Sequence, residues 1–143
     1  MIEPSLIVEG LSVWVLGRSV ADASNYADAN WLNIRASIQA NGASVSARGS
    51  ILMTSDFRRF REQLVSMYEK LAGEAELSGY EPNLKLTLRA TSLGRVTGEV
   101  EMTPDHLSQY HRFELGVDQS YLPALIASCD AILDEFPVIE MPA

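Results

Sequence analysis

The chain has 143 residues, of which 47% are hydrophobic, and its 19 acidic and 11 basic residues give a net charge of −8. This length is typical of one domain that buries its own core, so we expect a single domain over residues 1–143. The acidic balance disfavours nucleic acid as a partner, no apolar run approaches the roughly 20 residues of a membrane span, and the first residues lack the basic region of a secretory signal.

The first residues predict strands and then a polar connection. Residues 6–9 and 12–16 are short apolar stretches of strand character. Residues 17–30 form a polar segment, longer than most connections unless it is functional or mobile. Four side chains in this segment carry oxygen ligands but lack the spacing of a calcium loop, so turn formation is the better interpretation. These are Asp22, Asn25, Asp28 and Asn30.

A β-hairpin is predicted over residues 31–52. Asn41-Gly42 is the strongest short signal for a two-residue type I′ turn, which pairs Ala40 with Ala43. Stepping outward from this pair places apolar residues on one face and polar residues on the other along both strands, so turn and burial agree on one register. The apolar face holds Leu32, Ile34, Ala36, Ile38, Ala40, Ala43, Val45, Ala47, Gly49 and Ile51.

Arg35 and Arg48 lie directly opposite each other in this register. Like charges across a strand pair are destabilising, so a compensating charge or contact is expected. An acid on a neighbouring strand, Glu9 or Glu114, is the simpler source of compensation, and an acidic partner is the alternative. Both arginines are therefore candidate partner-binding residues.

Two helices are predicted, over residues 56–72 and 121–136. The first has Thr54 or Ser55 as N-cap and Gly73 as its end, and the second has Ser120 as N-cap. Each carries an apolar stripe at helical spacing. Cys129, the only cysteine, lies within the second stripe. It is expected to be a buried core residue, without a disulfide or metal role, which suits a reducing cytoplasm.

The helix ends carry charges that the helix dipole disfavours. Basic Arg58, Arg59 and Arg61 lie near the start of the first helix, and acidic Asp130, Asp134 and Glu135 lie near the end of the second. If the two helices lie side by side with these ends together, the clusters offset each other. The sequence therefore predicts that arrangement.

A second hairpin is predicted over residues 83–102. The three-residue loop 92–94, with Gly94 in the left-handed conformation, places Lys85 opposite Glu101 and Thr87 opposite Glu99. A four-residue turn around Pro104 and Asp105 then leads to a third strand over residues 107–117. Glu99 and Glu101 share the polar face of the hairpin's second strand, with Lys85 and Arg112 as expected neighbours. Paired carboxylates of this kind can serve in acid–base catalysis, but a solvated, charge-balanced sheet surface is the better interpretation, and both glutamates are candidate partner-binding residues.

Catalytic and metal motifs were sought along the chain. No phosphate loop, dinucleotide fingerprint or nucleophile elbow is found in the sequence. His106 and His111 have no metal-ligand spacing and are expected at the surface. We therefore expect no catalytic residues, metal or cofactor. A deep pocket with buried carboxylates, or converging histidines, would favour an enzyme, whereas a flat acidic surface with exposed aromatics would favour protein binding.

Two short motifs carry a family resemblance. The run YADANWLNI at residues 26–34 resembles the D-x-N-W-L start of the WapI-like immunity proteins, and EPNL at residues 81–84 is the second anchor. The order of elements along most of the chain is also similar, including the ILMTSDF segment at 51–57 that leads into a helix and the Phe136-Pro137 end of the last helix.

The resemblance implies a small bacterial protein that neutralises the toxin tip of a contact-delivered or wall-associated toxin. It brings no catalytic residues, and the motif positions are Asp28, Asn30, Trp31, Glu81 and Asn83. A structural role is favoured for them, with the Asx side chains holding backbone and the tryptophan packing at the sheet end. The acidic balance fits a basic toxin domain as partner.

Taken together, the sequence predicts an α+β fold with an antiparallel sheet of about eight strands and two α-helices packed on one face. The predicted function is non-catalytic protein binding by a cytoplasmic, toxin-neutralising immunity protein. The alternative is a bacterial domain of another role that self-associates as a homo-oligomer or binds another protein. Residues 138–143 are expected to be a flexible tail.

Overall fold

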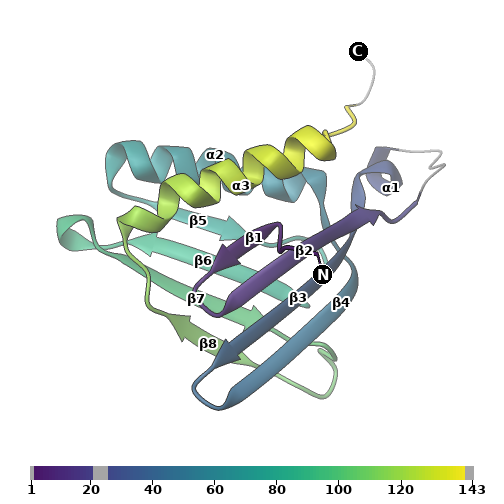
Figure 1. The fold of residues 1–143 in the computed structure, drawn as a ribbon, viewed down its shortest axis with the longest axis horizontal. Helices are drawn as coiled ribbons and strands as arrows, with labels where there is room; N and C mark the ends of the chain where they lie inside the picture. The colour runs from purple at the N-terminus through teal and green to yellow at the C-terminus, as the bar shows by residue number, and fades with distance from the viewer. Residues whose placement is uncertain (1, 21–25, 141–143) are drawn as a thin grey trace.

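The structure is a computed structural model that describes residues 2–20 and 26–140. Its described residues form eight antiparallel strands in two four-stranded sheets, together with α-helices (Figure 1). The α+β class and the antiparallel strands are thus confirmed. The strands are divided between two sheets rather than joined in the single sheet that the sequence predicted, and a short additional helix, α1, precedes the first hairpin.

Strands β1 to β4 make up the first sheet and strands β5 to β8 the second, each in chain order. The strands of the first sheet are Leu6–Val8, Leu11–Arg18, Trp31–Ala40 and Ala43–Met53. Those of the second are Glu74–Leu77, Leu84–Ala90, Val96–Met102 and Arg112–Leu115. Helices α1, α2 and α3 are Tyr26–Asn30, Thr54–Lys70 and Leu122–Glu135.

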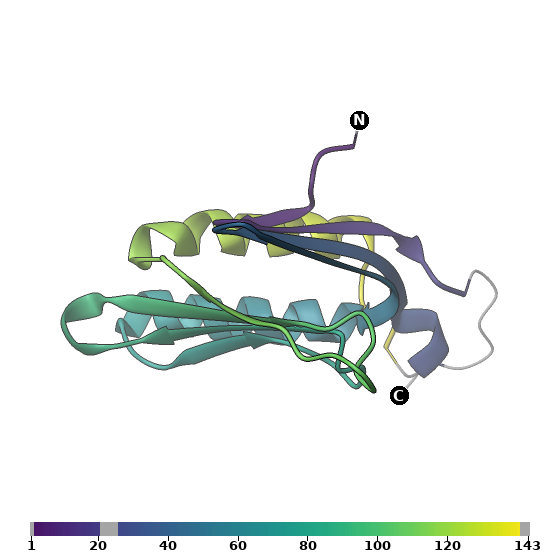
Figure 2. The ribbon, with the colours of Figure 1, turned by 90° about the horizontal axis from the view of Figure 1, so that it is seen from below.

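Each sheet is followed in the chain by a helix that packs against the other sheet. Helix α2 follows β4 and contacts β5, whereas α3 follows β8 and contacts β1, and the two helices contact each other. Figure 2 shows the two sheets facing each other, with the helices side by side along one edge. The inner faces of both sheets and the apolar stripes of α2 and α3 therefore share a hydrophobic cluster.

The first hairpin has the predicted turn and register. Asn41 and Gly42 have φ of 39° and 91°, as a type I′ turn requires, and Ala40 pairs with Ala43. A bulge at Ile51 shifts the last pairs, so that Leu32 faces Leu52. Between the turn and this bulge the side chains of the predicted apolar face are the more buried ones, except that Ala43 beside the turn is exposed.

The second hairpin also has the predicted register, but the strand after it is shorter. Gly94 has φ of 72° in the three-residue loop, and Lys85 pairs with Glu101. The prediction of a strand over 107–117 was wrong for its first half, because only Arg112–Leu115 forms β8. The Asp105 carboxylate accepts hydrogen bonds from the Leu107 amide (3.1 Å) and the Ser108 hydroxyl (2.7 Å), which stabilises a turn there instead.

Helix α2 begins two residues before the predicted start. The predicted caps, Thr54 and Ser55, are inside the helix, and the Asp56 carboxylate accepts a hydrogen bond from the Met53 amide (2.8 Å) at its start. Burial raises the pKa of Asp56, although the Met53 amide and Arg59 oppose that shift. Phe57 and other residues of the predicted stripe are buried.

The two long helices lie antiparallel with their oppositely charged ends together. Arg61 Nε of α2 lies 2.8 Å from Asp130 Oδ1 of α3. The predicted arrangement of the helix ends is therefore confirmed. Because both side chains are partly exposed, this ion pair contributes orientation more than stability.

The predicted connection over residues 17–30 was wrong at both of its ends. Strand β2 continues to Arg18, which pairs with Leu32 of β3, and residues 26–30 form α1. The Arg18 guanidinium donates hydrogen bonds to the carbonyls of Ala29 (2.8 Å) and Pro137 (2.6 Å). Residues 21–25 lie outside the described part of the chain. The described start of the predicted tail, residues 138–140, contacts the rest of the chain through Asn30 and Arg58.

Cys129 is fully buried in the α3 stripe, and burial raises the pKa of its thiol to about 12. At pH 8 only about one thiol in ten thousand is then ionised. We expect the native protein to react with an iodoacetamide probe orders of magnitude more slowly than the protein unfolded in guanidinium. Rapid labelling of the native protein, measured by mass spectrometry, would show instead that the thiol is accessible.

Candidate protein-binding surface

The outer face of the second sheet carries charged side chains from all four strands. Alternate residues of these strands, such as Leu86, Leu88 and Val100, point into the core, so the residues between them point outward. We call this surface the acidic face, since five glutamates outnumber three bases on it. Its charged residues are Glu74, Glu76, Lys85, Arg89, Glu99, Glu101, Arg112 and Glu114.

Ion pairs connect each base of the acidic face to a glutamate on a neighbouring strand. Arg89 Nε lies 2.9 Å from Glu74 Oε2, and Arg112 Nε lies 2.8 Å from Glu99 Oε1. These pairs cross the antiparallel ladders, where opposite charges stabilise strand pairing. The side chains are consequently held in one arrangement before any partner binds.

Lys85 lies between two carboxylates. Its Nζ is 3.3 Å from Glu76 Oε1 and 3.9 Å from Glu101 Oε2, so both predicted neighbours of the candidate glutamates, Lys85 and Arg112, are confirmed. The hydrogen bond and charge of Glu76 raise the pKa of Lys85. Burial tends to raise the pKa of Glu76, but hydrogen bonds from Ser78 and Lys85 and the Lys85 charge outweigh it and lower that pKa.

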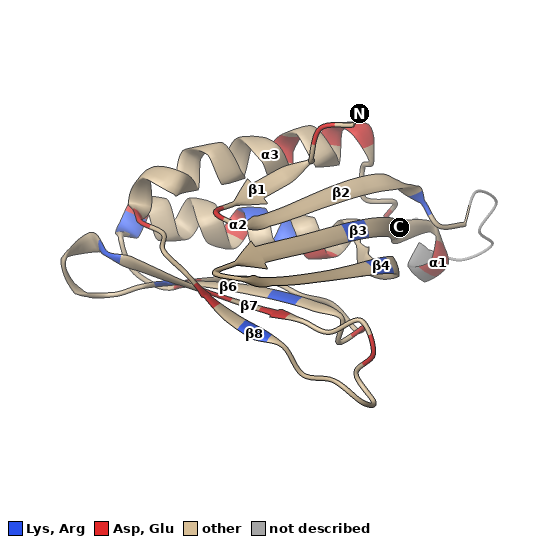
Figure 3. Ribbon diagram, turned by 60° about the horizontal axis from the view of Figure 1, so that its bottom comes forward, with Lys and Arg blue, Asp and Glu red and all other residues tan. Residues whose placement is uncertain are grey.

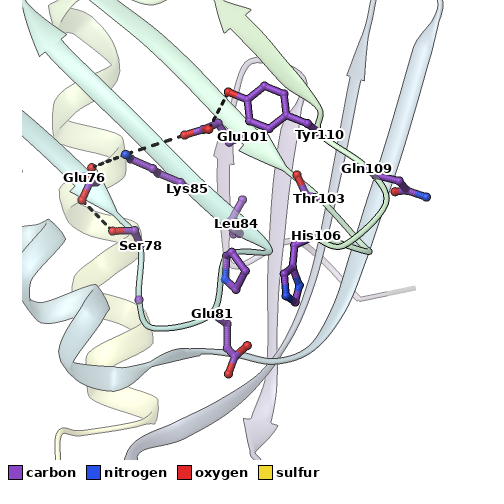
Figure 4. Close-up of a pocket in the computed structure, with 12 residues that line it drawn as sticks. Glu76, Ser78, Glu81, Leu84, Lys85, Glu101, Thr103, His106, Gln109 and Tyr110 are labelled. Atoms are coloured by element: carbon purple, nitrogen blue, oxygen red, sulfur yellow. Dashed lines mark hydrogen bonds and ion pairs between the residues drawn. The ribbon is translucent and has the colours of Figure 1, made fainter.

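An open groove of about 390 Å³ lies at one end of the acidic face (Figure 4). It lies between the ends of β5, β6 and β7, the segment at residues 78–82 and the loop at residues 103–110. Tyr110 donates a hydrogen bond from its hydroxyl to Glu101 Oε1 (2.9 Å), and this bond raises the pKa of the phenol. The groove thus combines a charged floor with an aromatic wall.

The segments that form this groove carry large side chains with exposed apolar surface. Tyr80 is 88% exposed, Leu107 is 87% exposed and Tyr110 is 67% exposed. Tyrosines at the edge of a charged surface are common anchors of protein–protein interfaces, because they bury area and keep a polar tip. An open groove with a charged floor and exposed aromatics resembles a protein-binding surface more than a deep catalytic pocket.

The groove offers little of the arrangement that acid–base catalysis needs. Glu76 and Glu101 both contact Lys85, and their side chains are 35% and 26% exposed. His106 lines the groove, whereas His111 Nε2 lies 3.3 Å from Gln109 Oε1, so the histidines do not form a pair. Within residues 2–20 and 26–140, no cluster of His, Cys, Asp and Glu is arranged to hold a metal, and no helix has the length and apolar character needed to cross a membrane.

The arginine pair lies on the other sheet. Arg35 and Arg48 face each other as predicted, but the expected compensation by Glu9 or Glu114 was wrong. Glu9 accepts from the Tyr121 hydroxyl, and Glu114 lies 3.6 Å from Arg112 Nη2. The guanidinium of Arg35 instead lies over the Trp14 ring, 4.7 Å from its centroid, where the aromatic face attracts a cation.

Asn30, a family-motif residue, connects three segments of the chain. Its side-chain oxygen accepts from the Thr54 hydroxyl (2.6 Å) and the Ile139 amide (2.8 Å), and its amide nitrogen donates to the Ile139 carbonyl (3.0 Å). Asn30 is 7% exposed and ends α1, whereas Asp28 lies exposed on the same helix. The start of β3, the start of α2 and the C-terminal segment therefore meet at Asn30.

The remaining motif residues lie near strand ends. Trp31 is half-buried at the start of β3, and its carbonyl accepts from the Ser19 amide (3.0 Å). Asn83 donates from its side chain to the carbonyls of Thr103 (2.9 Å) and Pro104 (3.3 Å), which ties the start of β6 to the loop after β7. Glu81 is exposed and lines the groove.

Several groove residues did not stand out in the sequence. Glu76 lies in β5, a strand of four residues that was not among the predicted ranges. Tyr110 fell within the strand predicted over residues 107–117, and its place beside Glu101 depends on the turn that replaces that strand. The alternation of charged and apolar residues in EAEL at residues 74–77 is a local signal for a strand with Glu76 on its polar face.

The comparisons with known proteins concern both sequence and fold. The model of a family described as Immunity protein WapI-like family matches residues 7–137. None of the curated proteins matches the sequence. Among solved structures, the plant transcriptional regulator PBF-2 has a TM-score of 0.52 and 9% identity, over 91% of this chain and 79% of that chain.

Two further solved structures are similar. WHY3 from Arabidopsis thaliana has a TM-score of 0.50 and 9% identity, over 92% of this chain and 85% of that chain. The CdiA-CT/CdiI toxin and immunity complex from Enterobacter cloacae has a TM-score of 0.43 and 11% identity, over 85% of this chain and 99% of that chain. At such identities the likeness to PBF-2 and WHY3 concerns the fold alone.

Replacing Asn30 by alanine tests its structural role. The Thr54 hydroxyl and the backbone of Ile139 would lose their partners, so we expect the free energy of unfolding to fall by about 2–3 kcal/mol. Asn33→Ala, on the exposed face of β3, is the matched control and should cost less than about 0.5 kcal/mol. Equal losses in urea denaturation of the two variants would contradict the assigned role.

Proposed function

The chain belongs to the WapI-like immunity protein family, and we propose that it neutralises a toxin by binding it rather than by catalysing a reaction. The family match over residues 7–137 is the observation that carries this proposal. It includes both sheets and both long helices almost entirely, so the match concerns the fold as a whole and not one motif.

We propose the acidic face and its groove as the toxin-binding surface. Two of the candidate residues from the sequence, Glu99 and Glu101, lie on this face and line the hollows in it. The face has an excess of negative charge, and Tyr80 and Tyr110 supply exposed aromatic surface beside it. This chemistry suits a toxin domain whose contact surface is basic.

Electrostatic attraction would act before contact forms. The net charge of −8 gives the protein a long-range negative field, which speeds the association of an oppositely charged partner at low ionic strength. Salt reduces this attraction because mobile ions screen exposed charges. The proposal therefore includes a binding rate that decreases as salt increases.

A domain that self-associates or binds another kind of protein is the alternative. The similar folds of PBF-2 and WHY3 do not decide between these roles, since a fold carries many functions. A regulator acting on nucleic acid is disfavoured for this chain by its net charge. The proposed compartment is the cytoplasm, in keeping with its single unpaired thiol.

Affinity capture of the tagged protein from lysate of its own organism tests the function. We expect mass spectrometry to identify a toxin fragment, captured more efficiently at low than at high salt, and co-expression of that fragment with this protein to restore growth. Recovery of the protein alone, when the toxin is shown to be expressed, would contradict the proposal and favour self-association.

A charge-reversed variant tests the surface. Glu99→Lys combined with Glu101→Lys should slow association with the captured toxin about tenfold and remove most of the salt dependence. Asp134→Lys combined with Glu135→Lys is the matched control, because both are exposed acids at the end of α3, which packs against α2 and β1. Association rates are measured by surface plasmon resonance. An equal change in both variants would show that the toxin does not bind on the acidic face.

Tyr110→Ala tests the aromatic wall of the same groove. Loss of an anchoring tyrosine should increase the dissociation rate of the toxin by about tenfold or more and leave the association rate nearly unchanged. Tyr68→Ala is the control, since Tyr68 is half-exposed on α2. An unchanged dissociation rate for Tyr110→Ala would exclude the groove wall from the interface.

A further inference from the structure

The strands of the two sheets differ in their acidic residues, which occur on the second sheet alone. The four strands of the first sheet contain three arginines, Arg18, Arg35 and Arg48, and no aspartate or glutamate. Figure 3 shows basic but no acidic residues on these strands, whereas acids are frequent on the second sheet. A basic surface on a chain with a net charge of −8 is not explained by overall composition.

Two of these arginines remain exposed and without an acid. Arg18 donates to two backbone carbonyls, but Arg35 contacts only the Trp14 ring, and Arg48 has no ion pair or hydrogen bond to any residue in the described ranges. They oppose each other on adjacent strands, which is a destabilising arrangement. Glu9 and Glu114 are engaged elsewhere, so an acid supplied by another molecule would relieve this repulsion.

Strand β4 beside them is a long edge strand. It runs from Ala43 to Met53 and pairs with β3, with no strand on its other side among the described residues. The two-residue turn makes Ala40 and Ala43 a hydrogen-bonded pair, and along the ladder such pairs alternate with pairs that exchange no backbone hydrogen bond. In the second kind of pair, the backbone N–H and C=O of the β4 residue point away from β3. The backbone groups that point to the free edge are consequently those of Ser44, Ser46, Arg48 and Ser50.

The same four residues place their side chains on the outer face of the sheet. Ser46, Arg48 and Ser50 are all exposed, so their side chains are accessible beside the edge. A strand added beside β4 would align some of its side chains with Arg48 across the new ladder. Carboxylates at those positions would neutralise Arg48 and approach Arg35 on the next strand.

We propose that the free edge of β4 binds an extended, acidic segment of a partner protein, which adds a fifth strand to the first sheet and pairs its carboxylates with Arg48 and Arg35. This site is separate from the proposed toxin-binding surface, which lies on the second sheet. Main-chain hydrogen bonds would supply affinity, and the arginines would supply the preference for acidic sequences.

Charge selects this occupant over two others. A second copy paired through β4 would bring the two arginines of each copy onto one continuous face, where like charges repel. A nucleic acid would carry phosphates to the arginines, but it would meet the repulsion of a chain with a net charge of −8. An acidic peptide strand has less total charge and pairs directly with the backbone.

Titration of the isotope-labelled protein with a peptide of alternating threonine and glutamate, about as long as β4, tests the proposal. We expect amide chemical shifts to change at residues 44–50, together with hydrogen-exchange protection at the outward-facing amides. A peptide of alternating threonine and lysine is the control and should bind at least about tenfold more weakly. Equal binding of both peptides, or no binding, would overturn the proposal.

Two variants separate the backbone and charge contributions. Ser46→Pro removes an amide that points to the free edge and leaves the β3–β4 ladder in place, so it should abolish binding while Ser46→Ala retains it. Arg48→Glu should weaken binding about tenfold, while Arg95→Glu, an exposed arginine next to the second sheet, changes it less than about twofold. Loss of binding in Arg95→Glu equal to that in Arg48→Glu would overturn the assigned contact.

Other occupants give distinct results in the same experiments. Protection of the β4 amides that increases with protein concentration in the absence of peptide, with a dimer in sedimentation, would show that a second copy occupies the edge. Shifts at β4 with a thymidine oligonucleotide but not with the acidic peptide would show a nucleic-acid site. Either result would overturn the proposal, and neither would alter the test of toxin binding on the acidic face.

Discussion

The antiparallel packing of α2 against α3 is the contact on which both sheets depend. Helix α2 joins β4 of the first sheet to β5 of the second and packs against β5, whereas α3 follows the second sheet and packs back against β1 of the first, so the two halves of the chain are interlocked. Phe57 and Phe60 of α2 and Cys129 of α3 are fully buried in the cluster that the sheets share. Separating the sheets would expose these stripes to water, at a cost of about 25 cal/mol for each Å² of apolar surface.

This arrangement leaves the outer faces of the sheets free for binding. The helices cover one edge of the assembly, and the inner faces fill the core, so neither outer face is needed for burial (Figures 1 and 2). Charged side chains on these faces therefore cost little in stability and can differ between the sheets. Cross-strand ion pairs such as Arg112–Glu99 fix the second face, whereas Arg35 on the first is held by an aromatic ring.

The sequence predicted the parts of the fold that local chemistry determines. Asn41-Gly42 and the strict alternation beside it specify one register, and Gly94 does the same for the second hairpin, because a one-residue slip would reverse every side chain. The charged helix ends predicted the antiparallel helices because each cluster of charge is unfavourable at its own helix end and is offset by the other cluster. The division into two sheets was not predictable in this way, since it depends on how α2 packs over the short strand β5.

The proposed binding surface was predictable only in part. Glu99 and Glu101 emerged from the register of one hairpin, but the groove also needs residues from β5 and from the loop after β7. These segments meet through long-range contacts, including the Asn83 hydrogen bonds to the loop, that no local pattern encodes. The sequence predicted that the repulsion between Arg35 and Arg48 needs compensation, but it did not predict that Trp14 supplies it. Trp14 becomes a neighbour of Arg35 only when β2 pairs with β3.

The segregation of charge has a geometric consequence for any partner. The acidic face and the β4 edge belong to different sheets, so a basic toxin on one would not have to displace an acidic strand on the other. Opposite charges on the two surfaces also prevent either partner from competing for the wrong site, because each would meet repulsion there. If both proposed sites are used, the protein would bind two partners of opposite charge at once, with the packed helices holding the two surfaces at a fixed separation.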